Sequence, residues 1–391
     1  MELFREMTVK AERIRHLMAE DYRHLHKHPE CGLQLPKTVS YVKDRLVGMG
    51  YEPKGCAEGI TATVGGGERC VLLRADMDGL PVSEKTDLEY RSENGKMHAC
   101  GHDMHVSMLL GAARLLKEIE KSLKGTVKLC FQPGEETLKG ASRMIGSGLL
   151  QDPDVSFAVM LHVLTGGEQK TGTIIIPPSG VGASGADFFK VTVKGKGCHG
   201  STPYLGRDPI VPLAHIISAL TSLTARELPA TSGNVLSVGQ VSAGTSANVI
   251  PEKAELFGTL RSYGDGEREY LKERLYEISK SIAVAYRCSV CVDFLSGCPS
   301  FYNDPYLVKT AKELYPEAYA MPEGTRGGGS EDFSYVSRHV PSIMLCLSAG
   351  GREEGYTEPL HSPSARFSEN TLPVGAAALA ALAVRLLSDT F

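Results

Sequence analysis

Apolar and polar positions in the first half of the chain follow two different periods. Apolar residues recur at helical spacing over Glu2–Lys27 and again over Lys37–Met49, which predicts two amphipathic helical segments. Four shorter segments are almost wholly apolar: ITATVG, CVLLRAD, TVKLCFQ and VSFAVMLHV. Runs of this kind are typical of strands that are buried on both faces of a sheet. The pattern therefore predicts an α/β core.

A different pattern follows the glycine- and proline-rich segment Pro177–Gly185. The elements expected there are the strand ADFFKVTVKG, a helix over 209–226, the strands NVLSVGQVS and KAELFGTLRS, a helix over 267–286 and the strand CSVCVDFL. This βαββαβ order is that of a ferredoxin-like unit. The first strand alternates polar and apolar residues, as at Lys190, Thr192 and Lys194, which predicts a sheet with one face in solvent.

The α/β pattern resumes after SGCPSFYNDP. A helix from Pro305, the strand SIMLCLSAG and a last helix near Ser368–Ser388 are expected there. A chain of 391 residues also exceeds what one hydrophobic core usually supports. We therefore predict a discontinuous, mixed-sheet α/β catalytic domain over 1–183 and 298–391, interrupted by an inserted domain over 184–297.

Net charge and cysteine content indicate which kind of partner and which cellular compartment to expect. The net charge of −4, without a basic run, gives no electrostatic case for nucleic acid or for an anionic membrane, so a small-molecule partner is expected. The charged N-terminal segment shows no secretory signal, and the apolar stretch 375–387 is too short to span a bilayer. Ten scattered cysteines then favour a reducing, cytoplasmic setting. Cys288 and Cys291 have metal-like spacing, but no second pair follows, so we favour a strand there.

The string MHACGHDMH holds the clearest candidate chemistry. Cys100 and His102 lie two residues apart on a glycine-containing, polar turn. A thiolate and an imidazole together suit a transition metal such as zinc. Asp103 and His105 could orient these ligands through hydrogen bonds.

A second candidate is the acidic pair in FQPGEE. Glu135 and Glu136 follow a predicted buried strand directly. One carboxylate could bind metal while the other moves protons. A solvated acidic pair is the alternative, and the sequence of this segment alone leaves both open.

Further candidates lie at other predicted strand ends. Asp76 follows VLLRA and His162 follows FAVML, and ligands of open α/β sheets collect at the carboxyl ends of strands. His361 lies in EPLHSPSARF. A single histidine beside apolar residues is more often a core residue, and Asp76 and Asp78 could simply cap a turn, so these positions leave their own role open.

Taken together, the motifs resemble a known family. LLRADMDGLPV, MHACGHDMH, FQPGEE, LHV, KGKGCHGSTP, GTSANVIPEKAELFGTLRS, GGSEDFS and LHSP occur in this order. They are similar to motifs of the amidohydrolase branch of the aminoacylase/carboxypeptidase metallopeptidase superfamily, which includes hippurate hydrolases, N-acetyldiaminopimelate deacetylases and auxin-conjugate hydrolases. The resemblance runs from about His26 to the C-terminal helix.

The resemblance implies roles for particular residues. The implied metal ligands are Cys100, His102, Glu136, His162 and His361, which would hold two divalent ions per subunit (zinc, manganese, cobalt or nickel). Glu135 would be the general base, and Asp76 and Asp103 would support the ligands. The inserted domain would be a lid and dimerisation domain, which makes a homodimer or larger homo-oligomer the expected assembly.

The resemblance also implies roles in the lid. His199 would stabilise the oxyanion, in similar proteins in the active site of the partner subunit, and Asn248 and Arg261 would contact the substrate carboxylate. Without the resemblance, these residues would be interpreted as a turn histidine, a loop asparagine and an exposed arginine. Cys198 stands where that branch usually has glycine, and its effect on the substrate pocket is open.

We therefore expect a metal-dependent hydrolase that cleaves the amide bond of N-acyl amino acids. A dipeptidase or carboxypeptidase with the same metal site is the nearest alternative. It is weakened because superfamily peptidases commonly have a histidine at the position of Asp76 and a bridging aspartate near Cys100. A non-catalytic metal or amino-acid binding protein is an alternative of another class, but all the implied ligands and the implied base are present.

Overall fold

The structure is a computed structural model that describes residues 2–388, and this part of the chain divides into two compact units. Unit 1 holds the chain up to Gly182, Tyr302–Thr325 and the chain from Tyr335 on, whereas unit 2 holds Ala183–Phe301 and Arg326–Ser334. The sequence-based division instead placed 326–334 in the catalytic domain. Hydrogen bonds within unit 2 account for the difference, because Tyr263 donates to the Gly327 carbonyl and the Ser184 amide donates to the Gly329 carbonyl.

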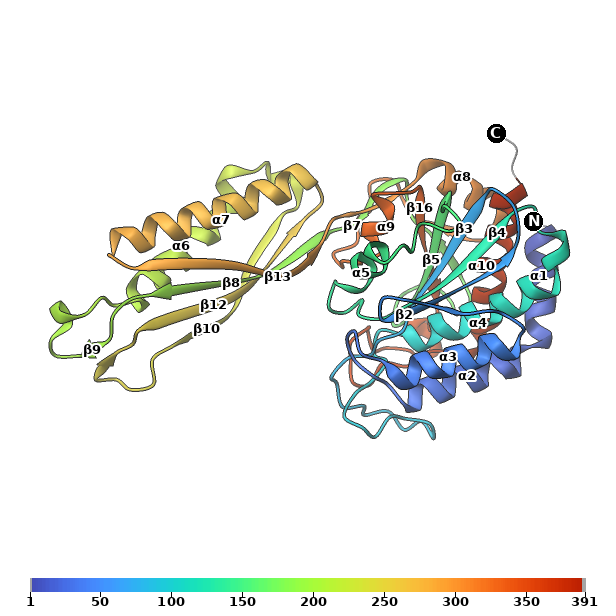
Figure 1. Cartoon of the computed structure of the whole chain (residues 1–391), viewed down its shortest axis with the longest axis horizontal. Helices are drawn as coiled ribbons and strands as arrows, with labels where there is room; N and C mark the ends of the chain where they lie inside the picture. The colour runs from blue at the N-terminus through green and yellow to red at the C-terminus, as the bar shows by residue number, and fades with distance from the viewer. Residues whose placement is uncertain (1, 389–391) are drawn as a thin grey trace. The chain divides into compact units, whose positions relative to one another are not determined.

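Unit 1 is built on one mixed sheet of eight strands (Figure 1). In spatial order these are β1 (Lys54–Cys56), β2 (Gly59–Gly65), β4 (Thr126–Gln132), β3 (Cys70–Asp76), β5 (Phe157–Leu164), β16 (Ser342–Ser348), β6 (Ile174–Ile176) and β15 (Tyr319–Ala320). The four central strands β4, β3, β5 and β16 run parallel to one another. Every residue of β3 and β4 is buried, as the apolar runs predict for a sheet covered on both faces.

The helices of unit 1 include α3 (Pro36–Gly48), α4 (His102–Glu118), α5 (Gly140–Gly146), α8 (Pro305–Leu314), α9 (Ser334–Ser337) and α10 (Leu372–Ser388). The helical segment expected over 2–27 is split into α1 (Glu2–Arg13) and α2 (Arg15–Lys27). At the split the Ile14 amide donates to the Ala11 carbonyl, a tighter turn than the α-helical one, with Ile14 at φ −106° and ψ 11°.

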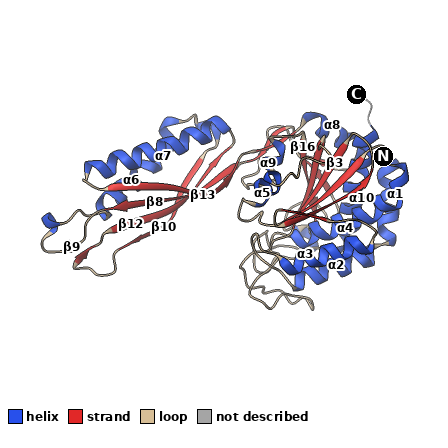
Figure 2. Cartoon of the chain, viewed as in Figure 1, coloured by secondary structure: helices blue, strands red, loops and turns tan. Residues whose placement is uncertain are grey.

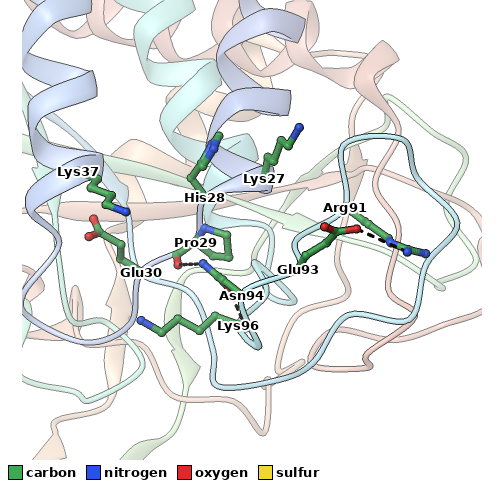
Figure 3. A pocket seen from close by; sticks show the side chains of 9 residues that line it. All are labelled: Lys27, His28, Pro29, Glu30, Lys37, Arg91, Glu93, Asn94 and Lys96. Atoms are coloured by element: carbon green, nitrogen blue, oxygen red, sulfur yellow. Dashed lines mark hydrogen bonds and ion pairs between the residues drawn. The ribbon is translucent and has the colours of Figure 1, made fainter.

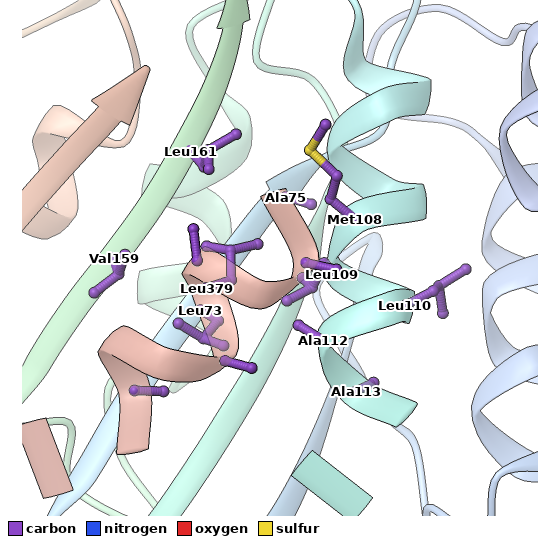
Figure 4. Close-up of a cluster of buried hydrophobic side chains, with 14 of the residues drawn as sticks. Leu73, Ala75, Met108, Leu109, Leu110, Ala112, Ala113, Val159, Leu161 and Leu379 are labelled. Carbon is purple, nitrogen blue, oxygen red and sulfur yellow. The ribbon is translucent and has the colours of Figure 1, made fainter. Parts of the chain in front are cut away.

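The core of unit 1 lies between the sheet and the pair α4 and α10. Leu73 and Ala75 of β3, Leu109 of α4 and Leu379 of α10 meet there (Figure 4). One helical span, Glu369–Ser388, is long and apolar enough by length and composition to cross a membrane, but 78% of it is buried inside the structure. Its apolar surface is therefore accounted for by packing against α4 and α1 within unit 1.

Unit 2 contains the predicted βαββαβ order (Figure 2). Its elements are β8 (Gly185–Lys194), α6 (Ile210–Glu227), β10 (Val235–Ala243), β12 (Lys253–Ser262), α7 (Asp265–Ala285) and β13 (Ser289–Cys298). The strands form an antiparallel sheet in the order β10-β12-β8-β13. Two short pairs complete the described strands: β9 (Cys198–His199) with β11 (Val249–Ile250), and β7 (Gly180–Ala183) with β14 (Phe301–Asn303).

Candidate metal centre

The predicted ligands of unit 1 lie where the central parallel strands end. Asp76 is the last residue of β3, His162 lies near the end of β5, and Glu135 follows β4 by three residues. The carboxyl ends of parallel strands meet at one edge of a sheet, so these side chains share a neighbourhood. His102 is the first residue of α4 and points at the same edge through its contact with Asp78.

Cys100 is the common member of two groups of ligand atoms. Its Sγ lies 3.6 Å from His162 Nε2 and 3.3 Å from His361 Nε2. One group is Cys100, His102 and His162, and the other is Cys100, Glu136 and His361, each with its ligand atoms within 4.8 Å of one another. A further group joins His102, Glu135 and Glu136. All five predicted ligands and the predicted base are thus brought together, although His361 follows Cys100 by 261 residues.

Two of the imidazoles are held in the tautomer that a metal needs. His102 Nδ1 bonds to the Asp78 carbonyl at 2.8 Å, and His162 Nδ1 bonds to the Val163 carbonyl at 2.7 Å. A carbonyl can only accept, so each Nδ1 carries a proton, and the neutral ring that a metal binds then has its lone pair on Nε2. This use of one ring nitrogen to orient the other is typical of metal-binding histidines.

Two buried ligand atoms without a hydrogen bond support a metal in this place. His102 Nε2 and Glu136 Oε1 make no hydrogen bond within the described chain, although Asp76 Oδ2 lies 3.6 Å from the first and His361 Nε2 lies 3.4 Å from the second. A buried polar atom without a partner costs about 1–3 kcal/mol. A divalent ion would satisfy both, and the donor set of thiolate, imidazole and carboxylate fits a first-row transition metal.

His361 reaches the group from a strained turn. It has φ +67°, which is uncommon for a residue with a side chain, and its backbone amide donates to the Ala99 carbonyl at 2.9 Å. This bond ties the C-terminal turn to the residue that precedes Cys100. Strain of this kind persists where the surroundings impose it, and functional sites are a common place for it.

Asp78 organises the site, a role that sequence reasoning missed. Its two carboxylate oxygens accept the backbone amides of Glu135 and Glu136 at 3.0 and 3.2 Å, and its carbonyl accepts the His102 imidazole. One buried residue therefore fixes both the acidic pair and the first residue of α4. Its position two residues after Asp76 was the available signal, but that spacing is equally compatible with a turn cap.

Asp76 contacts the candidate ligand His102 and two further buried side chains. Its carboxylate accepts His105 Nδ1–H and Arg74 Nη1–H, both at 2.5 Å, and one of its oxygens lies 3.6 Å from His102 Nε2. His105 Nε2 in turn accepts the Val163 amide at 2.8 Å. Both nitrogens of His105 are therefore occupied, so it orients neighbours and is not available to a metal.

The electrostatics of the cluster favour a thiolate. Burial raises the pKa of the Cys100 thiol, but the neighbouring His102 and His162 outweigh burial and lower that pKa to about 6. In the opposite sense, burial lowers the pKa of His162 while Cys100 raises it, with a result of about 9. Metal ligation requires the deprotonated thiol and neutral imidazoles, so metal binding here releases protons.

Asp103 lies one step away from the ligand atoms. Its carboxylate accepts His26 Nδ1 at 2.6 Å and the Met104 amide at 2.9 Å. It thereby bonds within the first turn of α4 and to α2, and it is not a member of the ligand groups described above. The supporting role of Asp103 stays a prediction.

The three predicted lid residues all lie in unit 2. His199 and Asn248 are neighbours, because β9 pairs with β11 and the Gly200 amide donates to the Asn248 carbonyl at 2.7 Å. His199 is exposed, and its Nδ1 accepts the Ser201 amide at 3.1 Å. Arg261, at the far end of β12, instead bonds to Ser330. The structure therefore places His199 beside Asn248 and leaves Arg261 at a separate position.

A hollow of about 320 Å³ lies elsewhere on unit 1 (Figure 3). It is lined by Lys27, His28, Pro29, Glu30, Lys37, Arg91, Glu93, Asn94 and Lys96. None of the residues of the ligand groups lines it. Most of its side chains are exposed, and Arg91 and Glu93 pair with each other.

Comparison with known proteins gives three findings. The sequence pattern of Peptidase family M20/M25/M40 matches residues 72–385. An IAA-amino acid hydrolase ILR1-like 2 of Arabidopsis thaliana is 34% identical over 386 residues, which cover 95% of this chain and 85% of the relative. An N-acetyl-L-cysteine deacetylase of Bacillus subtilis is 33% identical over 375 residues, which cover 94% of this chain and 87% of the relative.

A solved structure extends these findings to three dimensions. The crystal structure of the Bacillus subtilis YXEP protein, described as a dinuclear metal binding peptidase from the M20 family, aligns with a TM-score of 0.78 at 29% identity. The alignment covers 96% of this chain and 99% of that chain. The expected α/β fold with an inserted ferredoxin-like unit is therefore confirmed at the level of the family.

Proposed function

Because the chain belongs to Peptidase family M20/M25/M40, we propose that it is a metal-dependent amidohydrolase that cleaves the amide bond of N-acyl amino acids. The two relatives are named as an IAA-amino acid hydrolase and an N-acetyl-L-cysteine deacetylase. Both names describe hydrolysis of an N-acyl amino acid. Each reaction is hydrolysis of a linear C–N amide bond.

The observation that carries the proposal is the position of Cys100 in two ligand groups at once. Cys100, His102 and His162 would hold one divalent ion, and Cys100, Glu136 and His361 would hold a second. When bound, such ions supply Lewis acidity to the scissile carbonyl and to the attacking water. Cysteine and histidine ligation accepts zinc, manganese, cobalt and nickel, so supply in the cell would decide among them.

Glu135 is the residue that we assign to proton transfer. It is buried, its backbone amide is fixed by Asp78, and its carboxylate belongs to the same group of ligand atoms as His102 and Glu136. Glu135 takes the proton of the attacking water and passes it to the leaving amine. Glu136 is anchored through the same aspartate, so the two adjacent carboxylates keep separate tasks.

Unit 2 supplies the residues that we assign to the substrate. We propose that His199 stabilises the oxyanion and that Asn248 and Arg261 bind the substrate carboxylate. The pairing of His199 with Asn248 supports a shared task for these two residues. We further propose a homodimer formed through unit 2, and a cytoplasmic setting, which is supported by the ten free cysteines of the chain.

Amine release from a substrate panel tests the proposal. The panel contains N-acetyl, N-benzoyl and longer-chain acyl amino acids together with dipeptides, each assayed with zinc, with manganese and with chelator. Chelator-sensitive release from acyl amino acids is expected. No release from any acyl amino acid by the metal-loaded protein would contradict the proposal.

Dipeptides in that panel test the second candidate function. A carboxypeptidase or dipeptidase uses the same kind of metal site, and the description of the YXEP structure as a peptidase favours keeping this candidate. Cleavage of dipeptides alone would replace the amidohydrolase assignment with a peptidase.

A further inference from the structure

His26 of α2 is buried between two carboxylates. Its Nδ1 lies 2.6 Å from Asp103 Oδ2 and its Nε2 lies 3.1 Å from Glu84 Oε1. All three side chains are wholly buried. The rings of Tyr22 and Tyr90 flank the imidazole, each with its centroid 5.5 Å away.

This geometry favours a charged imidazole between two ionised carboxylates, since the pKa values of Glu84 and Asp103 are both lowered. A neutral imidazole donates from only one nitrogen, so its other nitrogen would face a carboxylate with lone pair against lone pair. An imidazolium donates to both carboxylates and balances part of their charge. The pKa of His26 agrees: burial lowers it, but the bonds to Asp103 and Glu84 outweigh burial and raise it to about 9.

The two partners of His26 belong to different parts of the chain. Asp103 lies in the first turn of α4, directly after His102. Glu84 lies in the segment 77–101, which connects β3 to α4 without a helix or strand. Glu84 also accepts hydrogen bonds from the Ser92 amide at 2.6 Å and from the Thr86 hydroxyl. These bonds connect the middle of the segment to the Glu84 carboxylate.

The segment 77–101 carries Asp78 and Cys100 and leads directly into His102. A connection of this length without its own secondary structure holds one conformation only where contacts outweigh the entropy of ordering it. The backbone pair of Leu80 with Met97 closes its base, at 2.8 and 3.0 Å. Asn94 also donates to the Pro29 carbonyl at 3.0 Å and the Lys85 amide to the Pro363 carbonyl at 2.8 Å. The His26 contacts, however, join the middle of the segment both to α2 and to the first turn of α4.

We infer that His26, through Glu84 and Asp103, is the positioning residue that holds the metal-binding end of this segment in place, and that its loss weakens metal binding without removing a ligand. The inference rests on the proposed metal centre. His26 touches none of the ligand atoms, so its effect reaches the metal only through the position of Cys100 and His102. Loss of supporting contacts of this kind typically weakens metal binding about 10–100-fold.

Cobalt binding by His26→Gln tests the inference, with His28→Gln as the matched control. His28 is exposed two residues away, and its Nδ1 bonds only to the His24 carbonyl. The measurements are the Co²⁺ dissociation constant by competition with a chromophoric chelator, the Co²⁺–thiolate spectrum, and the melting temperature of the metal-free protein. We expect a dissociation constant about 10–100-fold higher and an altered spectrum in His26→Gln, and neither change in His28→Gln.

Other outcomes separate the inference from its alternatives. A folded His26→Gln protein with wild-type affinity and spectrum overturns the inference, even if its metal-free melting temperature falls, because that result describes a structural role alone. If His26→Gln does not fold, Glu84→Gln decides, since it keeps the His26–Asp103 pair: weaker cobalt binding supports the inference and unchanged binding overturns it. Wild-type protein that binds cobalt but cleaves no substrate would contradict the proposed hydrolase and leave this inference standing.

Discussion

The thiol of Cys100 gives the site properties that a carboxylate in the same place would not have. A thiolate is softer and larger than a carboxylate, and its pKa of about 6 in this cluster means that it is mostly ionised at neutral pH before any metal arrives. Without metal, protonated His162 and His361 balance the thiolate at 3.6 and 3.3 Å. A metal ion would take the place of these protons, so its binding should release protons and weaken as pH falls.

Glu135→Gln should separate binding from catalysis. The amide keeps the size of the side chain and the backbone bond to Asp78, but it cannot accept a proton from water. We expect kcat to fall about 10²–10⁴-fold, the range of a lost general base, with the content of bound metal unchanged. Steady-state kinetics and elemental analysis of the same preparation measure both, and turnover near that of wild type would remove Glu135 from this role.

His26 should contribute a pH-dependent part of the stability. Its folded pKa of about 9 exceeds the ordinary value of 6.5, so the contribution is fully present below pH 6.5 and is lost as pH rises through 9. The groups that face it are the carboxylates of Asp103 and Glu84 and the rings of Tyr22 and Tyr90, and the buried His98 also interacts with its charge.

The measurement is urea unfolding of metal-free wild type and His26→Gln across this pH range. Their difference in unfolding free energy should shrink between pH 6.5 and 9 by up to about 1.4 kcal/mol per pH unit. A difference that stays constant with pH would show that His26 is not charged in the folded protein.

At the residue scale, the sequence indicated the candidate ligands and base more clearly than the residues that hold them in position. Cys100, His102 and the acidic pair stand in short motifs with their own signal, whereas a single histidine such as His162 cannot be told from a core residue without a resemblance to a family. Asp78 acts partly through its backbone carbonyl, which no side-chain pattern reports. His26 meets Asp103 across 77 residues, and pairings of that kind follow only from the fold.

The start of α4 is the element on which the ligands depend. Gly101 lies between the two ligands Cys100 and His102 with φ +82°, and a Cβ there would lie 2.3 Å from Val163 Cγ2. Glycine is required here for two reasons: its backbone adopts the left-handed conformation, and a side chain would collide with Val163 of β5. The site is therefore set by contact between α4 and β5 as well as by the turn itself.

Gly101→Ala should lower both stability and metal content. Gly95→Ala is the matched control, because Gly95 has a similar φ of +77° with nothing within 4 Å of the added Cβ. Gly95→Ala should lower the unfolding free energy by about 1 kcal/mol, because alanine disfavours the left-handed backbone. Gly101→Ala should lower the unfolding free energy clearly more and should also reduce the content of bound metal. Urea unfolding and elemental analysis measure the two effects, and equal behaviour of the two variants would contradict the role given to Val163.

Lys128, a buried lysine of β4, holds the connection between α5 and β5. Lys128 of β4 donates through Nζ to the carbonyls of Leu149, Gln151 and Pro153 at 3.0, 2.6 and 3.0 Å. Lys128→Met should lower the unfolding free energy by about 1–3 kcal/mol, because the buried Leu149 carbonyl loses its donor. The exposed Lys124→Met is the control and should change the unfolding free energy little. A neutral result for Lys128→Met would mean that water replaces the ammonium group.

Element boundaries followed the hydrophobic pattern closely where burial is uniform. β3 and β4 have the bounds of their apolar runs, because every position in them faces packed side chains. The break at Ile14 was missed because helical spacing continues across it, and the interruption is a local tightening of the backbone. The assignment of 326–334 to unit 2 also depends on hydrogen bonds between distant segments, which periodicity does not encode.

For the whole molecule, the metal should order one unit only. The ligand atoms and the contacts that hold them belong to unit 1, and each unit has its own hydrophobic core. Hydrogen exchange of the protein with and without Co²⁺ should show slower exchange in 77–105, 132–138 and 358–362, and little change in the strands of unit 2. Equal protection of unit 2 by metal alone would contradict this assignment.

The order of the chain has a consequence for synthesis on the ribosome. β16, which lies between β5 and β6 in the sheet, and His361 are both translated after the whole of unit 2. Until they emerge, the nascent chain has its first ligands but neither a complete central sheet nor the histidine of the second ligand group. With the proposed ligands, a product of premature termination before residue 361 would lack one member of the second ligand group. We therefore expect hydrolysis only from chains whose translation has passed that residue.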